Sequence, residues 1–206
     1  MKTLLQINAS MFSDKGQSSR LANQFVAAWR AAHADGKVID RDVGNAPVPH
    51  LTAQRFGALL AKPEERSAEQ QAVVDFSDGL IDELKRADVI VLGLPMYNFG
   101  IPSTLKAYFD HIARAGVTFA YTDKGPVGLL SEKKVYVFAT RGGHYVGTPM
   151  DTQTTYVRDL FRFLGIGDVE FIYAEGLNMG EQSKQSALAN AQSAIKQLSE
   201  PLRAAA

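Results

Sequence analysis

The stretch Asp88-Val89-Ile90-Val91-Leu92 is a short run of apolar and β-branched residues, and a Gly-Leu-Pro sequence follows it at positions 93–95. A run of this length and composition predicts a β-strand that is buried on both faces. Four further runs of the same kind occur along the chain, and they are Leu4–Asn8, Lys37–Arg41, Lys134–Ala139 and Val169–Tyr173. Strands that are apolar on both faces are typical of a parallel sheet covered by helices.

Amphipathic helices are predicted between these runs, because apolar residues recur there at helical spacing. Ser67 and Gln70 have the spacing of a capping box, Thr148-Pro149 predicts an N-cap followed by Pro, and Gly165 predicts a helix end. Strands that alternate with helices through right-handed crossovers form a doubly wound α/β sheet. We therefore expect a three-layer αβα fold with a five-stranded parallel sheet in the flavodoxin-like order 2-1-3-4-5.

The chain has 206 residues, with 22 Lys and Arg against 22 Asp and Glu, and it contains no Cys. This length predicts one domain over residues 1–206. A net charge of zero argues against nucleic acid as a partner, because nucleic-acid binding requires a basic surface. The absence of Cys excludes disulfides and Cys nucleophiles, so any redox chemistry must come from a cofactor. No signal peptide or membrane span is recognisable, which predicts a cytoplasmic protein without a membrane partner.

Ligands of doubly wound sheets bind beyond the carboxyl ends of the strands, where the strand order reverses. The first loop of this kind runs from Ser10 to Arg20 and leads directly into a predicted helix. Its hydroxyls, its Gly and the amides at the helix start are suited to a phosphate monoester. The alternative is that Ser18 only caps the helix. The loop contains neither the dinucleotide-binding glycine motif nor a P-loop.

The second loop, from Pro95 to Pro102, combines two prolines and a Gly with Met96, Tyr97 and Phe99. Apolar side chains on a solvent-facing loop are expected to be covered by a flat apolar ligand or by a partner. The alternative is a loop that folds back onto the core.

The third loop is Thr140-Arg141-Gly142-Gly143-His144. Consecutive glycines allow the main chain to approach a planar ligand and to direct two N–H groups at a carbonyl or an anion. His144 could polarise a ligand oxygen, or it could be an ordinary hydrogen-bonding residue. The other histidines, His33, His50 and His111, have no spacing suited to a metal ion, so no metal is predicted.

These loops, together with Ala115-Gly116-Val117-Thr118-Phe119, Tyr121-Thr122 and Phe163-Leu164-Gly165-Ile166, resemble the bacterial FMN-dependent NADH-azoreductases of the flavodoxin-like quinone reductase superfamily. The resemblance covers almost the whole chain, and its most specific part is Pro95-Met96-Tyr97-Asn98-Phe99. It implies that FMN is the cofactor and assigns residues to its parts. Ser10 and Gly16-Gln17-Ser18 would hold the phosphate, Met96-Tyr97-Asn98-Phe99 the flavin ring and ribityl chain, and Thr140-Arg141-Gly142-Gly143 the pyrimidine edge. Family members often have Ser where Gly16 and Thr140 stand.

Two long segments, Val43–Arg66 and Gly116–Lys133, do not fit a minimal five-stranded unit, and segments of this kind are often functional or pack on a neighbouring subunit. The resembled family is homodimeric, which implies a homodimer with the FMN sites at its interface. Phe119, Tyr121 and Phe163 would then line the substrate pocket, and ordinary core packing is the alternative. Phe99 and His144 are further candidates for this pocket.

The resemblance implies a ping-pong reaction in which NADH or NADPH gives a hydride to the flavin and then leaves. A small aromatic acceptor, such as a quinone, an azo dye or a nitroaromatic compound, would take its place. The cofactor performs this chemistry, so no side chain need act as an acid or base. The alternative is a flavodoxin-type FMN electron carrier without NADH turnover. Such carriers are usually strongly acidic, and the zero net charge argues against that alternative.

Overall fold

Five parallel strands form the central sheet of the computed structural model, which describes residues 1–204 and the side chains of residues 1–199. The strands are β1 (Thr3–Asn8), β2 (Lys37–Asp42), β3 (Val89–Pro95), β6 (Lys134–Thr140) and β7 (Asp168–Ala174). Their order is β2-β1-β3-β6-β7, and every neighbouring pair is parallel. The predicted order 2-1-3-4-5 is therefore confirmed, when the five strands are numbered among themselves.

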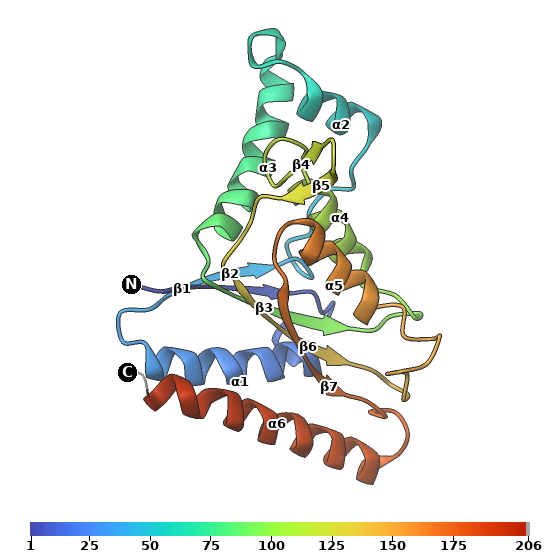
Figure 1. Ribbon diagram of the computed structural model, residues 1–206. Coiled ribbons are helices and arrows are strands. Elements are labelled where there is room, and N and C mark those ends of the chain that lie inside the picture. Colours follow the sequence, from blue (N-terminus) through green and yellow to red (C-terminus); the bar gives the residue numbers. More distant parts are fainter. Residues whose placement is uncertain (205–206) are drawn as a thin grey trace.

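Helices cover both faces of this sheet (Figure 1). On one face lie α1 (Gln17–Ala32) and α6 (Glu181–Ala204), and on the other lie α3 (Ala68–Arg86), α4 (Ser103–Ile112) and α5 (Thr154–Phe163). Successive residues of a strand point to opposite faces, so Leu4 packs with α1 and α6, whereas Leu5 packs with the other three helices. The three-layer prediction is confirmed.

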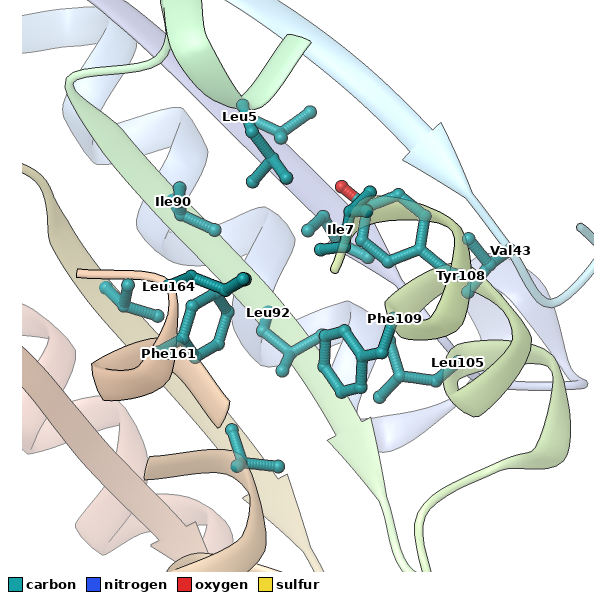
Figure 2. Packing of buried hydrophobic residues seen from close by; sticks show 14 of the residues in the cluster. Leu5, Ile7, Val43, Ile90, Leu92, Leu105, Tyr108, Phe109, Phe161 and Leu164 are labelled. Atoms are coloured by element: carbon teal, nitrogen blue, oxygen red, sulfur yellow. The ribbon is translucent and has the colours of Figure 1, made fainter. Parts of the chain in front are cut away.

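The larger core cluster fills the space between the sheet and α3, α4 and α5 (Figure 2). Ile7 and Leu92 extend from the strands toward Phe109 of α4 and Phe161 of α5, and all four side chains are at most 1% exposed. Burial of each such side chain contributes about 1.5–3 kcal/mol to folding. This packing holds the strand ends, and the loops that follow them, in fixed positions.

The two long segments form structure of their own. Val43–Arg66 contains α2 (Ala53–Leu60), which packs on α3, and Gly116–Lys133 contains the antiparallel hairpin of β4 (Phe119–Thr122) and β5 (Gly125–Gly128). Both lie at the top of Figure 1, beyond the sheet. We call these two segments the arm, and the large apolar side chains exposed on it are Phe56, Leu60, Tyr121, Val127 and Leu129.

Of the three helix-end signals in the sequence, two are confirmed and one is wrong. The capping box of Ser67 and Gln70 is present, and Gly165 follows α5 with a φ of 101°, as expected for a helix stop. The prediction at Thr148-Pro149 is wrong, because α5 begins only at Thr154. Thr148 instead closes a turn by donating its hydroxyl to the carbonyl of Tyr145. Within the described residues, no helix is both long and apolar enough to span a membrane.

Candidate functional site

A cavity of about 290 Å³ lies at the carboxyl ends of β1, β3 and β6. Three loops that are far apart in the sequence meet there, as the sheet order requires. The cavity contains nine of the residues that the sequence assigned to cofactor binding, namely Ser10, Gly16, Gln17, Pro95, Met96, Tyr97, Thr140, Arg141 and Gly142. It also contains four residues that sequence reasoning missed, namely Phe12, Leu177, Asn178 and Lys184.

One end of the cavity is the start of α1. The N-cap residue is Gly16, no side chain caps the helix, and no acidic residue lies in its first turn. The first N–H groups of a helix carry a partial positive charge and lack partners within the helix. Ser18 does not act as the cap: its Oγ is buried and has no hydrogen-bond partner within the described chain. A phosphate monoester is the ligand that this set of donors suits.

Tyr97 joins the first loop to the second. Its Oη lies 3.3 Å from the Oγ of Ser10 and accepts a hydrogen bond from the N–H of Met11, also at 3.3 Å. Tyr97 also borders a second cavity of about 470 Å³, which includes Asn98 and the first residues of α4. The tyrosine therefore lies between two neighbouring cavities and lines both.

The second loop turns back within four residues. Tyr97 and Gly100 exchange two backbone hydrogen bonds, at 3.1 and 2.9 Å, while Asn98 and Phe99 have φ values of 48° and 62°. Positive φ at both central residues is the signature of a type I′ turn. Gln153 Nε2 supports the turn by donating to the carbonyls of Pro95 and Gly100 at 2.9 and 3.0 Å. Asn98 and Phe99 are exposed, so this loop does not fold back onto the core.

The Arg141 side chain is fully buried in a pair of salt bridges. Its guanidinium lies 2.6 Å from Asp151 and 3.1 Å from Glu175. Glu175 also accepts hydrogen bonds from the backbone N–H groups of Tyr145 and Val146. The guanidinium therefore holds two loops together, a role that sequence reasoning missed.

The ionised form of Asp151 is stabilised by Arg141. Burial of the carboxyl disfavours the ionised form, but hydrogen bonds from Arg141 and Thr154 and the charge of Arg141 outweigh it, so the pKa of Asp151 lies below its ordinary value. Asp151 also accepts the N–H of Thr154 at 3.0 Å and thereby fixes the start of α5.

The loop after β7 forms the remaining wall. Backbone N–H groups of Leu177 and Asn178 donate to the carbonyls of Arg141 and Gly142 at 3.1 and 3.0 Å. The Asn178 amide lies so close to Gly142 that an added Cβ there would be 2.7 Å from its Nδ2. The strand-end rule could have predicted this loop, since β7 ends at the same edge of the sheet as β6.

Several predicted residues lie outside the first cavity. Ser18 is buried, Asn98 borders the second cavity, and Phe99 faces Tyr145 edge-on with ring centres 5.6 Å apart. Gly143 accepts a hydrogen bond from the N–H of Gly176 at its carbonyl.

The residues predicted for the substrate pocket also lie outside the first cavity of this chain, and they do not form one group. His144 borders a third cavity, between β7 and α6. Phe119 packs against Tyr121 and Phe163, with ring centres 5.4 and 4.3 Å apart, and none of the three lines the first or second cavity of this chain. No group of three or more His, Asp and Glu side chains in residues 1–199 is arranged to hold a metal ion.

A doubly wound sheet whose switch point carries a helix start with free donors and an apolar turn defines a flavodoxin-like ligand-binding protein. Comparison with known families agrees, because residues 1–198 match the family described as having a flavodoxin-like fold. The chain is 58% identical to an FMN-dependent NADH:quinone oxidoreductase of Cellvibrio japonicus, over 96% of this chain and 98% of that protein. It is 54% identical to a protein of the same name from Alcanivorax borkumensis, over 93% and 97%.

A solved structure gives the same result. The FMN-dependent NADH-azoreductase from Bacillus anthracis, determined in complex with FMN, superimposes with a TM-score of 0.89 at 27% identity, over 98% of this chain and all of that one. The chain belongs to the flavodoxin-like family and, within it, to the same family as these quinone oxidoreductases.

Proposed function

We propose that this protein is an FMN-dependent NAD(P)H oxidoreductase that reduces quinones and azo compounds. The observation that carries the proposal is the cavity at the switch point, which unites the start of α1, the turn after β3 and the glycine loop after β6. The relatives that share most of this chain's length carry the corresponding name. The whole chain is proposed to form one FMN-binding domain.

The residues present fit FMN. At the start of α1, the helix N–H groups and Gln17 are suited to the phosphate; Ser18, the next residue of the helix, has a buried Oγ without a partner among the described residues. Met96 and Gly142 also line this cavity, and the absence of a side chain at Gly142 allows a flat ring to approach the main chain there. The described lining contains no carboxylate, which suits a ligand that is negatively charged.

When bound, FMN would supply the redox chemistry by taking a hydride from NADH or NADPH and passing it to the acceptor that follows in the same place, while Gln17 and the first N–H groups of α1 would hold its phosphate. A quinone takes up this hydride and one proton from solvent to become a hydroquinone, while an azo bond requires two such rounds to give two amines. The chain positions the ring and its ligands. The N–H groups of Gly142 and Gly143 are proposed to stabilise negative charge on the ring.

The protein is further proposed to be a homodimer with its FMN sites at the interface. Two sets of exposed apolar side chains support this. One is on the arm and includes Leu60 and Tyr121, and the other surrounds the strand ends and includes Phe12 and Phe99. Exposed apolar patches of this kind mark interaction surfaces. Phe119, Tyr121 and Phe163 of one subunit would then complete a substrate pocket that also admits nitroaromatic compounds.

The test is an anaerobic visible spectrum of the FMN-reconstituted protein before NADH, after NADH and after a small quinone. Loss of the flavin band with NADH and its return with quinone are expected, with turnover at substoichiometric protein. Flavin that binds but stays oxidised after NADH and after NADPH would instead indicate an electron carrier. A protein that binds no flavin would contradict the proposal altogether.

A further inference from the structure

The described lining of the first cavity contains two cationic side chains, those of Arg141 and Lys184. Arg141, whose side chain is fully buried, is neutralised by salt bridges to Asp151 and Glu175, whose side chains are 8% and 13% exposed. Among residues 1–199, the one carboxylate within 4.0 Å of the Lys184 ammonium is that of Glu181, at 3.9 Å, and the two side chains are 38% and 70% exposed. Exposed pairs at this distance contribute little. Lys184 therefore brings a positive charge to the cavity that no strong ion pair offsets.

The fold places this charge beside the start of α1. Helices α1 and α6 lie side by side and begin at the same end of the sheet (Figure 1). Lys184 belongs to the first turn of α6, where its N–H donates to the carbonyl of Gly180. The cavity that Lys184 borders also contains Gly16 and Gln17, the first residues of α1. By contrast, Lys15 and Arg20 flank the same turn but are exposed, and neither borders the cavity.

We propose that Lys184 binds the phosphate monoester of FMN, which the helix start of α1 holds from the other side. This inference rests on the proposed function. A phosphate dianion gains most from a cation that is close and not already paired, and among the described cavity residues Lys184 meets both conditions. The assigned chemistry is that of a phosphate monoester, which the 2′-phosphate of NADPH shares, so the test must separate these two ligands.

The experiment compares binding of FMN and riboflavin, which lacks the phosphate, to the full-length apoprotein by quenching of flavin fluorescence. Lys184→Gln is expected to weaken FMN binding about tenfold, the usual effect of losing one charged hydrogen bond, and to leave riboflavin binding unchanged. Lys184→Arg should retain most of the FMN affinity. Salt should reduce the difference between the wild type and Lys184→Gln.

Two variants serve as controls. Lys196→Gln removes the same charge from an exposed position on α6 and should leave FMN affinity unchanged. Arg20→Gln tests the general field near α1. If Arg20→Gln and Lys184→Gln lowered FMN affinity equally, the effect would come from the positive charge of the region and not from a contact between Lys184 and the FMN phosphate.

Other outcomes would also overturn the inference. Equal losses of FMN and riboflavin affinity would mean that Lys184 acts through packing. If Lys184→Gln left FMN affinity unchanged but lowered the preference for NADPH over NADH, Lys184 would bind the 2′-phosphate of NADPH instead. If the wild-type protein bound neither FMN nor riboflavin, the proposed function itself would be overturned. This outcome is distinguishable from failure of the Lys184 inference, because it is seen in the wild type without any variant.

Discussion

Ser10 lies so close to Gly16 that a Cβ built on Gly16 would be 2.7 Å from the Ser10 Cβ and closer still to its Oγ. The Ser10 hydroxyl meanwhile accepts the N–H of Phe12 at 3.2 Å and lies 3.3 Å from the Tyr97 Oη. The space beside Gly16 is filled by the Ser10 side chain, so no side chain fits at position 16 without moving Ser10. Of these two residues, Ser10 supplies the hydroxyl.

Gly16→Ala is therefore expected to displace Ser10 and to weaken FMN binding. Overpacking of this kind costs roughly 1–2 kcal/mol of stability. Gly79→Ala is the matched control, because Gly79 lies exposed within α3 with no atom near an added Cβ, and this change should stabilise by about 0.5–1 kcal/mol. Urea unfolding and FMN titration of both variants provide the measurements. A Gly16→Ala protein that is as stable as Gly79→Ala would contradict the expectation.

Gly142→Val should weaken FMN binding at least tenfold, because the new side chain must push the Asn178 amide into the cavity or fill the cavity itself. Gly167→Ala is the control, since Gly167 is exposed and nothing lies near an added Cβ. Fluorescence titration with FMN compares the two. Wild-type affinity in Gly142→Val would argue that the ring does not approach this loop.

Arg141→Gln leaves two buried carboxylates without their cation and is expected to cost about 3–5 kcal/mol, as for other broken buried pairs. Arg162→Gln breaks only an exposed pair with Asp159, at 3.6 Å, and should cost less than about 1 kcal/mol. Chemical denaturation measures both. If the two substitutions had equal effects, the Arg141 network would not be holding the loops.

The lowered pKa of Asp151 predicts a pH dependence of stability. The ionised carboxylate is favoured in the folded state, so its contribution is complete above the ordinary Asp pKa of about 3.9 and is lost as pH falls through the lowered folded-state value. Asp151→Asn should therefore be less stable than the wild type at pH 7, and the difference should narrow below about pH 4. Denaturation curves at several pH values test this. A difference that stays constant down to pH 2.5 would rule out the titration of Asp151 as its source.

The proposed dimer predicts that a charge on the arm separates the subunits. Leu60→Glu places a carboxylate on a side chain that is 66% exposed in one chain, so the monomer fold should tolerate it. Sedimentation should show a dimer for the wild type and a monomer for the variant, with loss of quinone reduction. The control is Leu60→Met, which keeps the surface apolar. A wild type that sediments as a monomer would refute the dimer.

The fold could be predicted from the sequence because short segments rich in Val, Ile, Leu, Tyr or Phe alternate with helical patterns, although β2 at the sheet edge contains Asp and Arg and has no buried residue. The strand order then places the site at the carboxyl ends of these strands. The loops after β1, β3 and β6 could be found for the same reason. The salt bridges of Arg141 could not be predicted, because Glu175 is 34 residues away in the sequence. Nor could the position of Lys184 at the cavity, because the rest of the chain brings its helix beside the loop after β1 only in the folded structure. The error at Thr148-Pro149 has a similar origin, since tertiary hydrogen bonds of Gln153 to the β3 loop set where α5 begins.

The turn at Asn98 and Phe99 has a consequence for the evolution of this enzyme. The best sequence for a type I′ turn is Asn-Gly, and a bulky residue with a φ of 62° is costly there. Phe99→Gly would complete the preferred pair and relieve that cost, at the loss of the aromatic ring that faces Tyr145 at the strand ends. Selection for thermal stability alone should favour glycine at position 99. At this position the protein gives up stability for an exposed aromatic ring at the strand ends.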